Sequence, residues 1–466
     1  MAGQIPENFL ANSKVIRGFQ TFFSHSTTGG IMLILATIVA MLWANLDYDS
    51  YYGLWHTGIN ISLGDYSLFG YFEEGHGPFT LHTLINDAIM VIFFFFVGLE
   101  IKREILVGEL SSIKNSMLPI LGALGGVIFP ALIYYGFNAG NEIGMKGWAI
   151  PMATDIAFAL GVLMLVGKNV PTSLKVFLAA LAIVDDLIAV LVIAVFYTDH
   201  LSFVWLFGGF GFLAVMYIGN RLHIIQSAFY LLFGLGVWYC FLMSGVHATI
   251  AGVLGALMIP TTPLIKKQAF WSKTNQLWKM FTANMDRTRD DHLSDEQSDV
   301  LSTIEYGITR VVSPLRRIEH GLDYPVAFVI LPIFALANAG VNLSGFGVGN
   351  LVDPVTLGIV FGLFFGKIIG VTAFSWIAVK AKIANLPAGA TWPKILAVSL
   401  LCGIGFTMAM FVAGLAFKSN SPADVAALMD AKVGILLASL IAGISGYIIL
   451  KRAVAKMDDT ISPENS

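Results

Sequence analysis

The sequence predicts an all-α protein that crosses a membrane many times, and three observations support this fold class. The chain of 466 residues is 56% hydrophobic and only 12% charged, with a mean hydropathy of +0.77. Soluble domains carry about 25% charged residues, so this chain lacks the charge that a soluble surface needs. Long apolar runs recur along the chain, and in lipid a single segment satisfies its own backbone only as a helix.

Composition also excludes other classes. The net charge of −3 gives no indication of nucleic-acid binding, and the glycines show no collagen period. Only two cysteines occur, Cys240 and Cys402, and both lie inside apolar runs. We therefore interpret them as small core residues rather than as redox or metal-binding groups.

A membrane-spanning helix requires about 20 largely apolar residues. Residues 1–28 precede the first such run as an N-terminal segment, and 451–466 follow the last as a C-terminal tail, which leaves 29–450 as the spanning domain. Twelve runs meet the requirement: 29–46, 81–98, 117–136, 148–167, 173–197, 203–219, 224–242, 245–260, 324–340, 356–379, 395–417 and 433–450.

Lysine and arginine are distributed very unequally between the two sets of loops that twelve spans define. If the N-terminus is cytoplasmic, the cytoplasmic segments hold 23 of the 27 basic residues, and the outer segments hold Lys146, Lys418 and Lys432. The last one, Lys367, lies within a span. Because cytoplasmic loops carry an excess of basic residues, the pattern predicts two cytoplasmic termini and an even number of spans.

The long outer loop, 47–80, contains no lysine or arginine. Apolar and polar residues alternate from Ile59 to Leu63, ahead of Gly64-Asp65. This pattern is typical of a two-residue β-hairpin, and an irregular loop fits it about equally well.

The long inner loop, 261–323, begins with a stretch of mixed charge around 286–291. Apolar residues then recur at helical spacing: Val300, Ile304, Ile308, Val311 and Leu315. This spacing predicts an amphipathic helix that lies on the inner face of the membrane.

Four charged residues lie near the middle of predicted spans. They are Asp155 in span four, Asp185 and Asp186 in span five, and Lys367 in span ten. Each costs roughly 2.5–3.5 kcal/mol at the centre of a helix, so such residues are functional by default. Asp87 lies at a shallower depth in span two.

A structural ion pair would need one acid and one lysine, whereas here three carboxylates face one ammonium. Buried carboxylates without a partner tend to take up protons, and carboxylate oxygens also bind hard cations such as Na⁺. The adjacent pair Asp185 and Asp186 is expected to titrate as one unit. The pattern therefore predicts a site that binds either protons or a small cation, as a cation/proton exchanger requires.

Two other functions were weighed against exchange. An intramembrane aspartyl protease also uses two membrane aspartates, but it places them on separate helices in Tyr-Asp and Gly-x-Gly-Asp motifs, and neither motif occurs within a predicted span. A passive cation channel suits rapid flow, whereas paired acids beside a lysine favour tight binding at a site.

Helix breakers lie close to these charges. Pro151 is four residues before Asp155, and Gly403 and Gly405 interrupt span eleven. Broken helices are tolerated in a membrane where they line a cavity or are buried in protein, although glycines in a span equally serve close helix packing. Spans three to five and ten to twelve each have a broken middle helix, which is typical of inverted repeats.

A second group of charges lies at the predicted inner surface. Glu100 and Glu104 end span two, and Glu319 and His320 precede span nine. Such residues are usually solvated, but this titratable mixture would also serve to sense cytoplasmic pH. His247, at the outer start of span eight, is interpreted as a helix-end hydrogen-bonding residue rather than a ligand.

At these residues the sequence resembles the NhaA-type sodium/proton antiporters of bacterial inner membranes. The similarity extends from span two to span eleven and rests on these stretches: Asn86–Ala88, Val97–Glu104, Trp148–Gly161, Ala182–Leu187, Ser244–Thr249, Phe334–Gly340, Gly366–Lys367 and Leu401–Met408. The chain departs from the family pattern at Asp323, where the family has a histidine, and in its longer inner loop.

The resemblance implies a secondary transporter, not an enzyme, that exports Na⁺ or Li⁺ in exchange for protons without a cofactor. Exchange would be electrogenic and activated at alkaline pH. It further implies a homodimer joined at the outer hairpin. By residue, it implies sodium and proton binding at Asp185 and Asp186, a helix break with charge compensation at Thr154, Asp155 and Lys367, and pH sensing at Glu100, Glu104, Glu319 and His320.

Overall fold

The computed structural model is a bundle of long apolar helices. It describes residues 26–60, 62–63, 66–67, 79–167, 169–198, 201–283, 293–344, 347–418 and 421–461. In the first half of the chain the elements are α2 (Ser26–Leu46), α3 (Tyr48–Trp55), β1 (Ser62–Leu63), β2 (Tyr66–Ser67), α5 (Leu81–Leu84), η2 (Ile85–Ile89), α6 (Met90–Leu106), η3 (Glu109–Ser111), α7 (Ile113–Asn138), α8 (Glu142–Met145), η4 (Ile150–Met152), α9 (Ile156–Leu165), α10 (Thr172–Phe196), α11 (Phe203–Arg221) and α12 (Ser227–Ser244).

The second half contains most of the remaining spans and the helices of the long inner loop. Its elements are α13 (Ala248–Met258), α14 (Lys267–Ala283), α15 (Asp295–Val311), α16 (Pro314–Pro325), η6 (Val326–Ile330), α17 (Leu331–Asn338), α18 (Val348–Leu351), α19 (Pro354–Phe361), η7 (Gly362–Gly366), α20 (Lys367–Lys380), α21 (Trp392–Leu401), α22 (Phe406–Ala416) and α23 (Pro422–Ile461).

Length and composition confirm a polytopic helical membrane protein. Nine helices of the described residues are long and apolar enough to cross a membrane, and α21 with α22 forms a tenth candidate that bends by 45° at its break. Two predicted spans are represented only by shorter apolar segments, Ile150–Leu165 and Ala248–Met258. Neither is long enough as a single straight helix to cross the hydrocarbon core.

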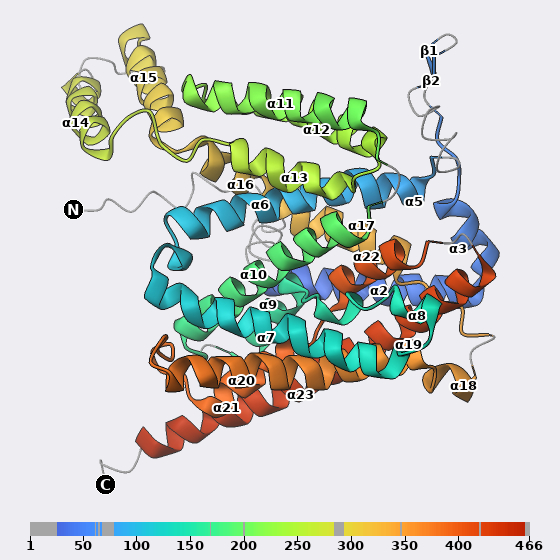
Figure 1. Cartoon of the computed structure of the whole chain (residues 1–466). Coiled ribbons are helices and arrows are strands. Elements are labelled where there is room, and N and C mark those ends of the chain that lie inside the picture. Colours follow the sequence, from blue (N-terminus) through green and yellow to red (C-terminus); the bar gives the residue numbers. More distant parts are fainter. Residues whose placement is uncertain are drawn as a thin grey trace.

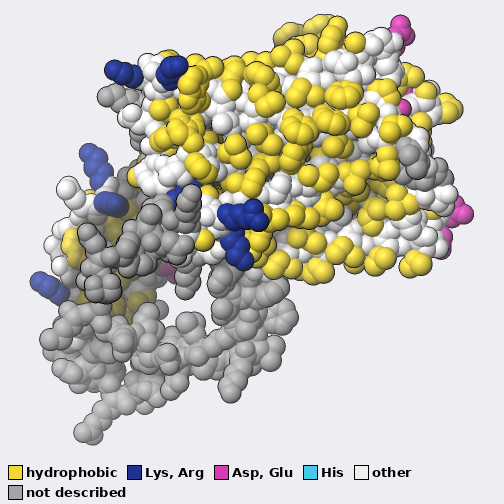
Figure 2. Space-filling model, turned by 90° about the horizontal axis from the view of Figure 1, so that it is seen from below, with side chains coloured by type: hydrophobic (Ala, Val, Ile, Leu, Met, Phe, Trp, Pro, Cys, Tyr) yellow, Lys and Arg dark blue, Asp and Glu magenta, His cyan; other side chains and the backbone are white. Residues whose placement is uncertain are grey.

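The charges are arranged as a membrane protein requires. Figure 2 shows one long face that is mostly hydrophobic, with lysine and arginine toward one end and acidic residues at the opposite end. In Figure 1 the long helices run in roughly one direction, with α14 and α15 at one end of the bundle and β1 and β2 at the other.

The segment before span nine is more helical than the sequence analysis predicts. The span was predicted to begin at residue 324, but α16, η6 and α17 form one continuous helical segment from Pro314 to Asn338. Ser313 caps its start by accepting a hydrogen bond from the backbone of Arg316, and proline is favoured at the first helical position. Glu319 and His320 therefore lie on a helix and not in a loop.

The predicted amphipathic helix of the inner loop is present, with two differences. It ends at Val311 rather than continuing to Leu315, because Val312 is extended and a new helix begins at Pro314. Its apolar side is covered in part by α14, which the sequence analysis missed: Val300 is buried, and Gly307 lies against the Phe270 ring.

At the position of the predicted hairpin, β1 and β2 pair in antiparallel register, with Ser62 opposite Ser67 and Leu63 opposite Tyr66. The two residues between the strands, Gly64 and Asp65, lie outside the described residues. The rest of the loop contributes an isolated antiparallel bridge between Gly58 and Thr80.

Spans three and ten pack backbone to backbone, and this contact sets the depth of the site. A Cβ on Gly125 of α7 would overlap the carbonyl of Gly370 in α20, and a Cβ on Gly370 would overlap the carbonyl of Gly125. Small residues allow this close approach in membranes. One residue further on, Gly126 leaves room for the Lys367 side chain, whose Nζ would lie 3.6 Å from a Cβ there.

Candidate functional site

The site is built where two interrupted helices meet. In span four the helical backbone stops after Met152 and resumes at Ile156, and in span eleven it stops after Leu401 and resumes at Phe406. Each interruption frees peptide groups that no water can satisfy in the interior of a membrane protein. The two breaks must therefore find hydrogen-bond partners elsewhere.

They find these partners in each other. The Asp155 backbone N–H donates to the carbonyl of Ile404 at 2.7 Å, and the Thr154 hydroxyl donates to the carbonyl of Cys402 at 2.9 Å. The Phe406 N–H donates to the Ser439 hydroxyl of α23 at 3.1 Å. The interruptions consequently stabilise one another, although they are almost 250 residues apart in the sequence.

The Asp155 carboxylate caps two helices at once. Its Oδ1 accepts the N–H of Phe158 at the start of α9 at 2.9 Å. Its Oδ2 accepts the N–H and the hydroxyl of Thr407 at the start of α22, at 3.1 and 2.5 Å. Both helices direct their positive N-terminal ends at this one buried carboxylate. Three protein groups therefore hold the Asp155 carboxylate at the place where the two breaks meet, which we call the crossing.

Lys367 links the end of the first half of span four to span five. Its Nζ lies 2.6 Å from Oδ2 of Asp185, and both side chains are fully buried. It also donates to the carbonyl of Met152, the last residue before the span-four break. The π-helical turn η7 immediately precedes Lys367, and such turns occur frequently at functional positions.

Asp186 lies beside this pair and is only 1% exposed. Among the described residues, neither Oδ1 of Asp185 nor Oδ2 of Asp186 has a hydrogen-bond partner. Buried polar atoms are normally satisfied, so these two carboxylate oxygens on adjacent residues are able to accept a further partner. Oxygen atoms of this kind are suited to accept a proton or to bind a small hard cation.

In the described part of the chain, no three His, Cys, Asp or Glu side chains come together as metal ligands. Any cation at Asp185 and Asp186 would therefore have two carboxylates as its charged ligands, and the remaining ligands would be neutral. Thr154 and the carbonyls of the two breaks are the neutral oxygens that the same crossing supplies.

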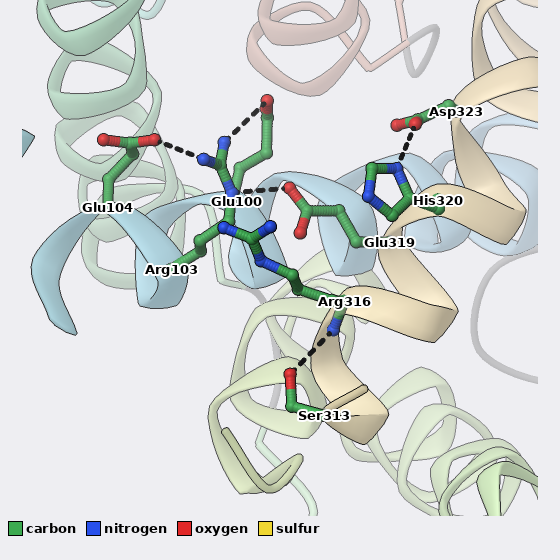
Figure 3. Close-up of polar contacts among 8 residues, drawn as sticks. All are labelled: Glu100, Arg103, Glu104, Ser313, Arg316, Glu319, His320 and Asp323. Carbon is green, nitrogen blue, oxygen red and sulfur yellow. Dashed lines mark hydrogen bonds and ion pairs between the residues drawn. The ribbon is translucent and has the colours of Figure 1, made fainter. Parts of the chain in front are cut away.

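The predicted inner cluster is organised around Arg103, which the sequence analysis did not include among its site residues. Figure 3 shows Arg103 between three carboxylates. Its guanidinium lies 2.7 Å from Glu319, 2.8 Å from Glu104 and 3.9 Å from Glu100. The spacing to Glu100 was available as a signal, because residues three apart are neighbours on the surface of a helix.

His320 lies apart from this group. Its Nδ1 is 3.2 Å from Oδ2 of Asp323, and its side chain is 70% exposed (Figure 3). Of the four predicted pH-sensing residues, the structure thus brings together Glu100, Glu104 and Glu319, while His320 pairs with the residue that departs from the family pattern.

A cavity lies between the inner cluster and the start of α9. It has a volume of about 380 Å³ and is lined by Glu100 and Asp323 together with Ile156 and Ala157, the first two residues of α9. Because Asp155 immediately precedes Ile156, the inner end of the cavity lies next to the crossing.

Asp87 lines a different cavity, of about 240 Å³, together with His82, Asn86, His247 and Lys418. It lies in the π-helical turn η2, and its Oδ1 is 3.5 Å from Nε2 of His247. His247 is the residue before the first turn of α13, and its Nδ1 is 2.9 Å from the Thr249 hydroxyl. This is the helix-end position that the sequence indicates. Asp87 therefore does not join the Asp185–Asp186 site.

Comparisons with known proteins agree over nearly the whole chain. The model of the Na⁺/H⁺ antiporter 1 family matches residues 20–450. The chain belongs to this Na⁺/H⁺ antiporter family. It is therefore a secondary transporter and not an enzyme.

Individual relatives support the same assignment. The chain is 46% identical over 439 residues to the Na⁺/H⁺ antiporter NhaA of Oleidesulfovibrio alaskensis, covering 94% of each chain. It is 45% identical to the NhaA of Sulfurimonas denitrificans, covering 96% of this chain and 97% of the relative. It is 44% identical to the NhaA of Helicobacter pylori, covering 94% and 97%.

Thr407 and Arg103 are the two site residues that sequence reasoning missed. Thr407 follows the glycines of span eleven and carries a hydroxyl in an apolar run, which was a weak signal. Its contact with Asp155 depends on the crossing of the two breaks, and no local pattern predicts that crossing.

Lys367→Ala is expected to destabilise the antiporter strongly. Removing one partner of a buried ion pair costs about 3–5 kcal/mol, because the other charge is left unpaired. Thermal unfolding in detergent should show a large fall in the melting temperature. Lys380→Ala is the matched control, since Lys380 ends the same helix, is exposed and has its Nζ 4.4 Å from the centre of the Trp376 ring. Equal melting temperatures for the two variants would contradict the role of the buried pair.

Proposed function

We propose that this protein exports Na⁺ or Li⁺ in exchange for protons, with Asp185 and Asp186 as the shared binding site and no cofactor. The observation that carries the proposal is the pair of vacant, buried oxygens on these adjacent residues. A carboxylate cannot bind a proton and Na⁺ at the same time. Competition at one site therefore couples the two ions without any further device.

Each other residue of the crossing has a supporting role in this proposal. The negative charge of Asp155 compensates the positive N-terminal ends of α9 and α22. The Thr154 hydroxyl bonds one break to the other, and the positive charge of Lys367 compensates the carbonyl of Met152, where the helical backbone of span four stops. Lys367 also holds Asp185 in place while that residue is charged. When protons or Na⁺ occupy the site, this balance changes, and the crossing is the element that would respond.

The proposed topology has twelve spans, both termini in the cytoplasm and a location in the bacterial inner membrane. The nine long helices, the bent α21–α22 pair and the two shorter segments would together supply twelve crossings. Spans three to five and ten to twelve would be inverted repeats, since each group contains one of the two broken helices. The β1–β2 pair supports a dimer contact at the outer surface.

The cellular role that fits this exchange is pH homeostasis and salt tolerance. The cavity that carries Glu100 would open to the cytoplasm and admit Na⁺ for export. The Arg103 cluster at its margin would adjust activity to cytoplasmic pH. In this proposal the inner end of the bundle regulates activity, and the crossing binds the transported ions.

Asp186→Asn is expected to abolish exchange while the protein still folds. The substitution keeps the shape of the side chain but removes a charge and a proton-binding oxygen. Na⁺-driven proton movement should fall to background in everted vesicles, with an unchanged melting temperature. Asp49→Asn, on the exposed surface of α3, serves as the control. Exchange near the wild-type rate in Asp186→Asn would refute the assignment.

Exchange is expected to be electrogenic. Two carboxylates that give up one Na⁺ can take up two protons, so that net positive charge moves inward for each Na⁺ exported. An imposed membrane potential, negative inside, should then drive Na⁺ export from proteoliposomes in the absence of a pH gradient. Insensitivity to potential would show that one proton is exchanged for one Na⁺.

The pH dependence is expected to have two separable parts. Because protons compete with Na⁺ at Asp185 and Asp186, the apparent Na⁺ affinity should fall as cytoplasmic pH falls. Replacing Glu319 and His320 together by glutamine removes one carboxylate from Arg103 and the partner of Asp323. We expect the activity profile of this variant to shift along the pH axis while its maximal rate is retained. An unmoved profile would mean that competition alone accounts for pH control.

A further inference from the structure

Three polar side chains join spans two and nine near the end of the bundle that carries β1 and β2 (Figure 1). The Nε2 atom of His82 in α5 lies 3.2 Å from Oδ1 of Asn338, the last residue of α17. Asn338 donates from Nδ2 to Oδ1 of Asn86 in η2 at 3.1 Å. Asn86 in turn has its Nδ2 3.2 Å from Nδ1 and 3.1 Å from Nε2 of His82. These side chains close a circle of hydrogen bonds, which we call the His82 network.

The backbone of α17 determines the direction of these hydrogen bonds. The Nδ2 atom of Asn338 also donates to the carbonyl of Phe334 at 3.0 Å, so this amide cannot turn without placing its own oxygen against that carbonyl. Oδ1 of Asn338 must therefore accept the proton on Nε2 of His82. The other nitrogen of a neutral imidazole is an acceptor, so Nδ1 accepts from Asn86. The network thus requires a neutral His82 in one defined tautomer.

A second proton on His82 is incompatible with this arrangement. Both nitrogens of a charged imidazole are donors, so an N–H at Nδ1 would face the Nδ2 donor of Asn86. If the Asn86 amide turned, its Nδ2 would face Nδ2 of Asn338, and the mismatch would only move to the next contact. Asn338 is 5% exposed, and a buried polar group without a partner is costly. Protonation therefore breaks the network at one of its three contacts.

Solvent reaches the network from one side. The His82 side chain is only partly buried. His82, Asn86 and Asn338 all line the cavity of about 240 Å³ that also contains Asp87. A proton from this side of the protein therefore has access to the imidazole without passing through the crossing.

Charged and titratable groups from several elements surround His82. Those that line the same cavity are Asp87, Tyr197, His247 and Lys418. His56 of α3 stacks on His82 with the ring centroids 5.6 Å apart, and Lys432 of α23 interacts electrostatically with both histidines. Histidines change charge near neutral pH, so a response to pH has to be assigned among the three histidines by substitution.

The same two spans are also joined at their other ends. There Arg103 of α6 contacts Glu319 of α16. The first helix runs from Leu81 to Leu106 and the second from Pro314 to Asn338, so each has one polar junction at either end. A change at either junction acts on the relative position of the same two helices.

We propose that the His82 network is a latch between the outer ends of spans two and nine, which holds while His82 is neutral and is released when a proton from the outer side binds to it. The proposal rests on the proposed topology only for the side of the membrane on which the latch lies. It involves neither Asp185 nor Asp186, and it gives the outer surface a proton response that is separate from the Arg103 cluster.

The test measures backbone hydrogen exchange of the purified full-length protein by mass spectrometry. Spectra are taken at about pH 7.5 and about pH 5.5, on either side of the ordinary histidine pKa, and are corrected for the intrinsic effect of pH on exchange. The reporters are the peptides that cover 81–89 and 331–340. The helix α11, which contributes no residue to the network, is the internal reference.

His82→Gln is the main variant, because a glutamine amide supplies one donor and one acceptor and takes up no proton at these pH values. His56→Gln and His247→Gln are the matched controls, since each removes a neighbouring histidine and leaves the network in place. Asn86→Ala removes the network itself. Asp186→Asn separates the latch from the proposed ion-binding site.

In the unsubstituted protein we expect exchange of both reporters to rise roughly fivefold at the lower pH, the change in an opening equilibrium that loss of one hydrogen bond causes. The rise should be absent in His82→Gln and should persist in His56→Gln, His247→Gln and Asp186→Asn. Asn86→Ala should show the raised exchange at both pH values. Ion exchange that survives in Asp186→Asn would refute the proposed function and leave the latch untouched.

Four outcomes would overturn the latch. Equal exchange at both pH values in the unsubstituted protein would show that the network does not respond to protons. A rise that His82→Gln retains, or that either control variant loses, would assign the response to another group. A rise that disappears in Asp186→Asn would assign it to the ion-binding site. Low exchange in Asn86→Ala at neutral pH would show that the network does not hold the two spans, whether or not His82→Gln folds.

Discussion

The structure depends on one constraint: two helices are broken inside a membrane protein, and their free peptide groups must be satisfied by each other. The backbone of Asp155 and the hydroxyl of Thr154 bond to carbonyls of the span-eleven break, and the Asp155 carboxylate caps both following helices. Because every one of these groups is buried, displacing any of them leaves another without a partner. The geometry of the two breaks is therefore tightly constrained by these hydrogen bonds.

This arrangement determines how the remaining charges can act. Asp155 is fully engaged by the two helix N-termini, and Asp185 is held by Lys367. Among the described residues, Oδ1 of Asp185 and Oδ2 of Asp186 accept no hydrogen bond from the protein. The proton and cation binding that we propose therefore falls on the adjacent pair, next to the two helix breaks. In this proposal, a change of charge there would act on the backbone that the two breaks leave without helical hydrogen bonds.

At the inner surface, too, one charged side chain is shared by several partners. Arg103 contacts three carboxylates from two elements, so it links α6 to α16 (Figure 3). Glu319 is the one of these carboxylates that belongs to α16, so loss of its charge weakens the link between two helices that both line the cavity with Glu100 and Asp323. Sequence reasoning recognised the acids because they end predicted spans. It missed Arg103 as their centre, because which acid reaches the guanidinium depends on how α16 packs.

The sequence by itself determined the membrane class, the approximate positions of the spans and the four charges at mid-depth. These follow from hydrophobicity and charge, which can be evaluated within some 20 residues. The tertiary structure decided that Lys367 meets Asp185, that Thr407 joins Asp155 and that α14 covers the apolar side of α15. Asp185 and Lys367 are 182 residues apart, and Asp155 and Thr407 are 252 apart. Contacts of this kind arise only where helices pack, because the partner of a buried polar group is chosen by the position of distant backbone and not by its sequence neighbours.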